Sequence, residues 1–136
     1  MKEYVLDANA LVRLFRNAPG ADTVDDLVRQ AKAGRAHLSV SVVNLTEFLY
    51  VLTRYIGQEN ALEFVDKASR VAEPKTVDEQ IAIDTGILKI RYKLGLADCY
   101  AAELAVRTGA TLVTADPEFA KLGKRLKVLS LPRHSA

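Results

Sequence analysis

Hydrophobic residues recur along the chain with two spacings, one typical of strands and the other of helices. Short apolar or β-branched runs predict strands. These runs are residues 3–6, 37–43, 111–114 and 126–131, with a strand or turn at 71–74. Apolar residues three or four positions apart predict helices, most of which end at a glycine or a Pro-Gly pair. The predicted helices are residues 10–17, 22–33, 44–56, 58–70, 77–94, 97–108 and 117–122.

Strands alternate with helices across short connections, which indicates an α/β fold around a parallel sheet. The strands are few and short, and the helix content is high, so we expect helices on both faces of the sheet. The longest predicted helix, residues 77–94, carries an apolar stripe of Ile83, Ile87, Ile90 and Leu94. A chain of 136 residues that is 49% hydrophobic and 26% charged has the size and composition of one globular domain, residues 1–136.

Composition excludes several kinds of site. The single cysteine, Cys99, excludes an intramolecular disulfide and a cysteine-based zinc site, and we interpret it as a buried small residue. The two histidines, His37 and His134, are too far apart in sequence for a His-x-x-x-His metal motif. No apolar run reaches the roughly 18–20 residues of a membrane span, and no apolar signal region precedes the first acids. We therefore expect a soluble, cytoplasmic protein without a membrane partner.

The net charge of +2 argues against binding of nucleic acid by charge alone. The charge is nevertheless uneven, because residues 119–136 contain five basic residues and no acid. These are Lys121, Lys124, Arg125, Lys127 and Arg133. Such a tail is either a solvated surface or a docking patch for a polyanion.

Four acids lie near the predicted carboxyl ends of strands, which is where open parallel sheets bind ligands. Asp7 ends the first strand, and Glu47 lies in the first turn of the helix after the second. Asp116 follows the strand at 111–114, and Asp98 lies in the first turn of the helix before that strand. We therefore expect these acids to face the same edge of the sheet.

Each acid also has an ordinary structural explanation. Asp7 and Asp116 are suited to cap helices, Asp98 suits the positive end of its helix, and Glu47 fits a capping box with Asn44. Four carboxylates in one crevice, however, would repel one another and resist ionising together. A hard divalent cation on oxygen ligands relieves this repulsion, which favours Mg²⁺ or Mn²⁺ over zinc.

Four sequence blocks around these acids resemble those of the PIN-domain ribonuclease family. The blocks are YVLDANAL at residues 4–11, SVSVVNLTEF at 39–48, LGLADCYAA at 94–102 and LVTADPEF at 112–119. They occur in the family's order, and the resemblance extends from about residue 3 to residue 131. Within the family, the length and layout are most similar to VapC-type toxins of type II toxin–antitoxin pairs.

This resemblance implies a three-layer α/β/α sandwich with a short, mainly parallel sheet of four to five strands. It also implies four ligands for Mg²⁺ or Mn²⁺, namely Asp7, Glu47, Asp98 and Asp116. Thr114 would help to hold the acidic site or its water, and Asn9 would orient Asp7. The implied activity is endonucleolytic hydrolysis of RNA by water, which leaves a 5′-phosphate and a 3′-hydroxyl. Glu47 and Asp98 are the candidates for the general base. The implied partners are RNA, a cognate antitoxin and a second copy of the chain.

Binding of RNA requires contacts to phosphates. The basic candidates are Arg13, Arg16, Arg54, Arg91 and Lys93. Arg54 is the best placed, since it lies seven residues after Glu47 on the same helical face. Apolar residues on both faces of the helices at 44–70 predict either a partner surface or a purely internal core. They are Leu45, Phe48, Leu49, Leu52, Tyr55, Ile56 and Phe64.

Three other functions are open to such a fold. A magnesium-dependent phosphatase or receiver domain needs a second acid beside the nucleophilic aspartate, which Asp7-Ala8-Asn9 lacks, and a late lysine directly after a strand, which the strand at 111–114 lacks. The others are a non-catalytic module that binds RNA or assembles with partners, and a free-standing PIN nuclease in RNA processing. Metal-dependent cleavage of RNA that is lost in Asp7→Asn or Asp98→Asn separates an enzyme from the non-catalytic module.

Overall fold

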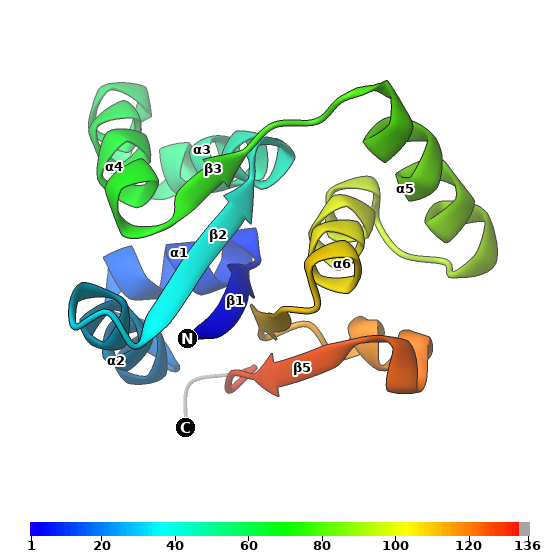
Figure 1. Ribbon diagram of the computed structural model, residues 1–136. Helices are drawn as coiled ribbons and strands as arrows, with labels where there is room; N and C mark the ends of the chain where they lie inside the picture. Colours follow the sequence, from blue (N-terminus) through cyan, green and yellow to red (C-terminus); the bar gives the residue numbers. More distant parts are fainter. Residues whose placement is uncertain (134–136) are drawn as a thin grey trace.

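A five-stranded, all-parallel sheet runs through the molecule, with strand order β3-β2-β1-β4-β5 (Figure 1). The computed structural model describes residues 1–133, so His134 and the end of the basic tail lie outside the described residues. The strands are β1 (Lys2–Leu6), β2 (Ala36–Ser41), β3 (Glu73–Lys75), β4 (Thr111–Thr114) and β5 (Lys127–Ser130). The predicted α/β fold is confirmed, and its sheet is parallel throughout.

Within the described residues, six α-helices and one 3₁₀-helix connect these strands. They are α1 (Ala8–Arg16), α2 (Ala21–Lys32), α3 (Val42–Ile56), α4 (Gln58–Val71), α5 (Glu79–Arg91), α6 (Leu96–Thr108) and the 3₁₀-helix η1 (Pro117–Arg125). Every predicted helix is present, with ends that differ by a few residues. No helix of residues 1–133 combines the length and the apolar character needed to cross a membrane.

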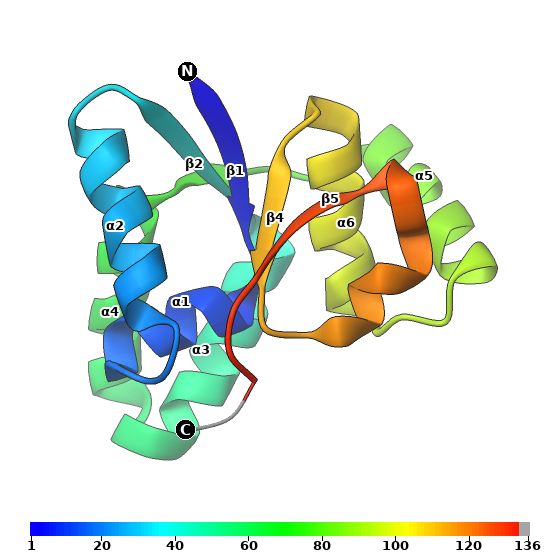
Figure 2. The same ribbon diagram turned by 90° about the horizontal axis from the view of Figure 1, so that it is seen from below.

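Two hydrophobic cores lie on opposite faces of the sheet and make the fold a three-layer sandwich (Figure 2). Side chains alternate between the faces of a strand. Leu6 and Val113 accordingly pack with α1 to α4, whereas Val5 and Leu112 pack with α5, α6 and η1. The strands are therefore apolar on both faces, as expected for a covered parallel sheet.

The apolar residues of α3 and α4 belong mainly to the first core, which favours the internal core among the two predicted roles for most of them. Phe48 and Leu52 are buried. Phe15 of α1 lies between Phe48 and Phe64, with ring centroids 5.7 and 5.3 Å away respectively. Other apolar side chains of the pair pack against the same core, namely Leu45, Leu49 and Ile56. Tyr55 is exposed, with 56% of its surface accessible to solvent.

Helix α5 is shorter than predicted, and α3 is the longest helix of the described residues. Asp78 caps the start of α5 by accepting a hydrogen bond from the Ile81 N–H at 2.9 Å, and Tyr92 is extended. The helix packs on α6 through Leu88, and Leu94 of the predicted stripe is buried, whereas the isoleucines of the stripe face outward. Its isoleucines Ile83, Ile87 and Ile90 are 50%, 47% and 85% exposed.

Candidate functional site

Asp7 lies at the centre of the carboxyl edge of the sheet, directly after β1. The strands β2 and β3 are added on one side of β1, and β4 and β5 are added on the other side. The order of the strands in the sheet therefore reverses at β1. Such a point is where open parallel sheets form a ligand-binding crevice. Asp7 is 1% exposed, and its Oδ1 accepts a hydrogen bond from the Ala8 N–H at 2.8 Å, which caps α1. Its role as a helix cap therefore coexists with its place in the crevice.

Three acids from three different elements meet at this edge. Asp7, Glu47 of α3 and Asp98 of α6 each contribute one carboxylate oxygen to a group whose members all lie within 4.8 Å of one another. Asp7 is buried, whereas Glu47 and Asp98 are half-buried and reach solvent. The group offers oxygen ligands only, which suits a hard divalent cation such as Mg²⁺ or Mn²⁺.

The pKa values of Asp7 and Asp98 are raised by burial and by the neighbouring acids. Burial is the largest cause for Asp7, and together with the Asp98 carboxylate it raises the pKa of Asp7 to about 7. Burial, followed by the charges of Asp116 and Glu47, raises the pKa of Asp98 to about 6. Near neutral pH these carboxyl groups therefore resist ionising together, as the sequence predicts, and a bound cation would reverse that resistance.

Asp116 lies beside the three-acid group rather than within it. Its Oδ1 accepts a hydrogen bond from the Glu118 N–H at 2.9 Å and so caps η1. Its charge is nevertheless the largest electrostatic cause of the raised pKa of Asp98, so it acts on the same edge. Asp116 is thus placed to complete the acidic site from the side of η1.

Asn9 and Thr114 hold the Asp7 carboxylate from the side of β4. The Thr114 hydroxyl donates to Asp7 Oδ2 at 2.8 Å, and Asn9 Nδ2 donates to the same oxygen at 2.9 Å. Asn9 Oδ1 in turn accepts from the Ala115 N–H at 2.9 Å, and Thr114 Oγ1 accepts from the Asp116 N–H at 3.0 Å. These bonds fix the orientation of Asp7.

The proposed capping box of Asn44 and Glu47 is wrong. Helix α3 begins at Val42, because the Ser41 hydroxyl caps it by accepting from the Val43 N–H at 3.3 Å. Glu47 therefore lies in the second turn of α3. Its carboxylate points to the acidic edge, where Oε2 accepts from the Tyr50 hydroxyl at 3.4 Å.

Asn44 joins the two helices that carry Glu47 and Asp98. It is fully buried, and its Nδ2 donates to the Ala97 carbonyl of α6 at 3.2 Å. Within residues 1–133 its Oδ1 has no hydrogen-bond partner. Sequence reasoning missed this role because Asn44 suited a helix cap; its position one turn before Glu47 was the available signal.

Gly95 leaves the space that Asp98 occupies. A Cβ atom at position 95 would lie 3.2 Å from Asp98 Oδ2, which is closer than ordinary van der Waals contact. The backbone of Gly95 has φ −60, so the requirement is for space and not for an unusual conformation.

A cavity of about 350 Å³ adjoins the acids, with Asn9 and Glu47 in its wall and Arg13 and Arg16 of α1 beside them. The Arg16 guanidinium lies 3.6 Å from the ring centroid of Tyr55, and Arg13 donates to the Arg133 carbonyl at 2.8 Å. The cavity is thus cationic next to an acidic edge, a charge pattern that suits a phosphate-bearing ligand.

Arg54 and Lys93 do not line this cavity. The Arg54 guanidinium lies 5.5 Å from the ring centroid of Tyr50, whose hydroxyl donates to Glu47 Oε2. Lys93 is exposed in the connection between α5 and α6, where its carbonyl accepts a hydrogen bond from Lys121 at 3.1 Å.

Solved structures of VapBC toxin–antitoxin proteins share this fold. VapBC2 from Rickettsia felis, bound to a DNA fragment from its promoter, has a TM-score of 0.73 and 19% identity over 94% of this chain and 98% of that chain. DNA-bound VapBC from Salmonella typhimurium has a TM-score of 0.72 and 20% identity over 96% and 98%. VapC20 from Mycobacterium tuberculosis, described as a sarcin-ricin loop cleaving toxin, has a TM-score of 0.71 and 14% identity over 88% and 95%.

The search of curated proteins found no match to the chain. A family model matches residues 4–125, which include all four acids and most of the chain; it is the model of the PIN domain. The predicted family resemblance is confirmed by this match, and the structural likeness agrees with it. The chain belongs to the PIN domain family.

Proposed function

We propose that the protein is an endoribonuclease that uses Mg²⁺ or Mn²⁺ to hydrolyse RNA phosphodiester bonds. The observation that carries this proposal is the meeting of Asp7, Glu47 and Asp98 within 4.8 Å at the edge of the sheet. A phosphodiester is anionic, and three carboxylates alone would repel it. Their convergence favours a site that functions with a bound cation.

The chain supplies the residues to hold such a cation. Asp7, Glu47 and Asp98 are the proposed ligands, and Asp116 is a fourth acid at the same edge. When bound, a divalent cation lowers the pKa of a water ligand and offsets the charge of the phosphodiester. Asn9 and Thr114 keep Asp7 in one orientation through their hydrogen bonds to its Oδ2.

The different burial of the three acids is the basis for assigning them different chemical roles. Both oxygens of Asp7 already accept hydrogen bonds, and the residue is buried, so we assign it to binding the cation. Glu47 and Asp98 reach solvent, and one of their carboxylates is the proposed acceptor for the proton of the attacking water. Tyr50 donates to Glu47 Oε2 and helps to position that side chain.

The cationic cavity beside the acids is the proposed contact for the RNA strand. Arg13 and Arg16 would bind phosphates next to the scissile bond, since they share a cavity wall with Glu47. Arg16 is held by its stacking on Tyr55, which reduces the entropy lost when a phosphate binds. Arg54 beside Tyr50 and the exposed Lys93 between α5 and α6 would contribute to the overall attraction.

We also propose that the protein is the toxin of a type II toxin–antitoxin pair and forms a homodimer. The fold shared with VapBC proteins supports the first part. The exposed isoleucines of α5 support the second, because Ile90 is 85% exposed and Ile83 is 50% exposed. Light scattering should report a dimer for the wild type and a monomer for Ile90→Glu. A monomeric wild type would contradict the dimer.

Cleavage of labelled RNA by the purified protein tests the proposed activity. We expect cleavage in Mg²⁺ or Mn²⁺, and none in EDTA or with Asp98→Asn. Asp66→Asn is the matched control, since Asp66 is an exposed acid paired with Arg70 on α4, away from the edge. A protein that binds RNA but never cleaves it, or whose cleavage survives EDTA and Asp98→Asn, would reject the proposal and favour a non-catalytic or metal-independent role.

A further inference from the structure

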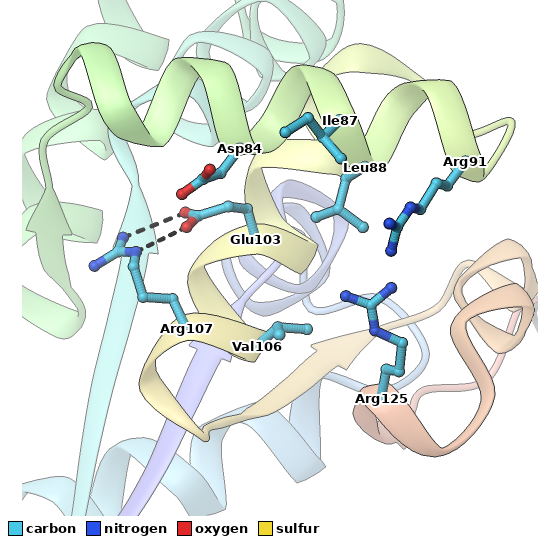
Figure 3. A pocket seen from close by; sticks show the side chains of 8 residues that line it. All are labelled: Asp84, Ile87, Leu88, Arg91, Glu103, Val106, Arg107 and Arg125. Carbon is cyan, nitrogen blue, oxygen red and sulfur yellow. Dashed lines mark hydrogen bonds and ion pairs between the residues drawn. The ribbon is translucent and has the colours of Figure 1, made fainter.

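A second cavity, of about 280 Å³, lies between α5, α6 and η1. Figure 3 shows Arg91 of α5 and Arg125 of η1 pointing toward one another at one end of it. Leu88 and Val106 form apolar wall between the helices. The opposite end holds Glu103, which pairs with Arg107 at 2.8 Å. Arg107 is thus offset by Glu103, and the unpaired positive charge of the cavity lies at the end with Arg91 and Arg125.

The two arginines at that end lack acidic partners. Among residues 1–133, neither Arg91 nor Arg125 forms an ion pair. Arg125 donates to the Tyr92 hydroxyl at 3.0 Å, which orients its guanidinium without neutralising it. Asp84 also lines the cavity, but Figure 3 places it beside Glu103 at the other end. Two like charges that face each other across an opening create a site for an anion.

This end of the cavity is connected to the acidic edge by η1. The helix begins next to Asp116 and ends at Arg125. Lys121 in its middle donates to the Lys93 carbonyl, which holds η1 against the connection between α5 and α6. Gly123 has a non-helical backbone (φ 55, ψ −130), so η1 consists of two short 3₁₀ segments that meet at a kink, and Arg125 lies just beyond that kink.

Basic residues from two distant parts of the sequence therefore form one strip, which we call the basic seam. It consists of Arg91, Lys93, Lys121 and Arg125. Glu118 is the acid on this part of η1, and it pairs with Lys121. Two of the five basic residues of the tail, Lys121 and Arg125, thus belong to the seam.

We propose that an RNA strand bound at the acidic site continues along the basic seam, and that a phosphate outside the acidic site binds between Arg91 and Arg125. This inference rests on the proposed ribonuclease function. The seam would make the affinity for RNA depend on the length of the RNA, because RNA that extends along η1 gains phosphate contacts that a short RNA cannot make. The unpaired charge of both arginines favours a polyanion over a neutral partner.

Two RNAs that share one cleavage site test the proposal. The first is only long enough to cover the acidic edge, and the second extends by about eight nucleotides on each side. For the wild type, we expect a lower KM for the extended RNA. The KM of the short RNA divided by the KM of the extended RNA measures the advantage of the longer substrate. Arg91→Ala/Arg125→Ala should reduce this ratio about 5–10-fold. It should also make the salt dependence of extended-RNA binding shallower by about one to two ions. Arg29→Ala/Arg70→Ala is the control, because those arginines pair with Asp25 and Asp66 on α2 and α4.

The single variant Arg91→Ala should fold even if the double variant does not, because within the described part of the chain the Arg91 side chain makes no hydrogen bond. The double variant also loses the hydrogen bond from Arg125 to Tyr92. The single variant should lower the ratio about 2–4-fold. An unchanged ratio in both variants would overturn the proposal. Variants with an unchanged ratio but weaker binding of an acidic peptide would also overturn the proposal, because the seam would then bind protein and not RNA. If the wild type cleaves neither RNA, the proposed function fails separately. In that case, the affinity of the extended RNA for Asp98→Asn is compared with its affinity for Asp98→Asn combined with Arg91→Ala/Arg125→Ala. Equal affinities would show that the seam does not bind RNA.

Discussion

The Asp7→Asn substitution separates the stability of the fold from its proposed activity. Asp7 is buried, and the neighbouring acids make its ionised form costly in the absence of a cation. Asparagine has nearly the same shape but carries no charge. We therefore expect the variant to be more stable than the wild type at pH 8 in EDTA, while it binds Mn²⁺ weakly and does not cleave RNA.

The pKa of Asp7 sets the size of this effect. It is about 7 in the folded protein against 3.8 for an ordinary aspartate. At about 1.36 kcal/mol per pKa unit, the ionised carboxylate destabilises the metal-free fold by roughly 4 kcal/mol at pH 8. The substitution keeps an acceptor for the Ala8 N–H, but it places an amide against the donating Nδ2 of Asn9. That conflict costs about 1–3 kcal/mol. The expected net gain is therefore about 1–3 kcal/mol.

The gain must depend on pH with a definite sign. The unfolded chain releases the Asp7 proton near pH 3.8, whereas the folded chain retains it until about pH 7. Between these values the folded state binds more protons, so the wild type loses stability as the pH rises. The advantage of Asp7→Asn should therefore grow by roughly 2–3 kcal/mol between pH 5 and pH 8.

Urea unfolding followed by circular dichroism, at pH 5 and pH 8 in EDTA, measures this change. Repeating it at pH 8 with Mn²⁺ should raise the unfolding free energy of the wild type much more than that of the variant. A variant that is less stable than the wild type by the same amount at both pH values would refute the reasoning. Equal stabilisation of both proteins by Mn²⁺ would show that the cation binds elsewhere.

Three further substitutions test other parts of the structure. Thr114→Val removes the hydroxyl donor to Asp7; we expect about 1–3 kcal/mol less stability in urea and about 10–100-fold slower cleavage, and an unchanged rate would contradict its positioning role. Gly95→Ala crowds Asp98 but suits the backbone, so cleavage should slow without loss of thermal stability; a lower melting temperature would indicate backbone strain instead. Hydrogen bonds to two glutamates raise the pKa of His37, so the stability it contributes is complete below pH 6.5 and is lost as the pH rises through the folded pKa. His37→Gln should therefore lower the melting temperature at pH 6 and not at pH 9, and an equal loss at both would contradict this reading.

The fold was largely predictable because its signals are local. The apolar strands and the glycines after helices can be read from neighbouring residues, and they place Asp7 and Thr114 at strand ends. The outer helix was less predictable. The isoleucines of α5 have the spacing of a buried face, but α5 packs on α6 through Leu88 instead. Spacing alone does not determine which side of a helix its neighbours cover.

The candidate site was predictable only in part. The acids follow from strand ends and from the family's blocks, and Asp7, Glu47 and Asp98 do meet. The residues that support them depend on contacts distant in sequence. Asn44 reaches α6 across 53 residues, and Gly95 is needed because of where the Asp98 side chain turns. Such contacts become visible only when the helices are placed in space.

The chemistry of RNA ends tests the central claim most directly. RNA incubated with the protein can be sequenced by methods that distinguish a 5′-phosphate from a 5′-hydroxyl and a 3′-hydroxyl from a cyclic phosphate. We predict new ends with a 5′-phosphate and a 3′-hydroxyl in Mg²⁺ or Mn²⁺, which are absent in EDTA and with Asp98→Asn. The same ends in EDTA or with Asp98→Asn, or cyclic phosphate ends, would contradict hydrolysis at the three-acid site.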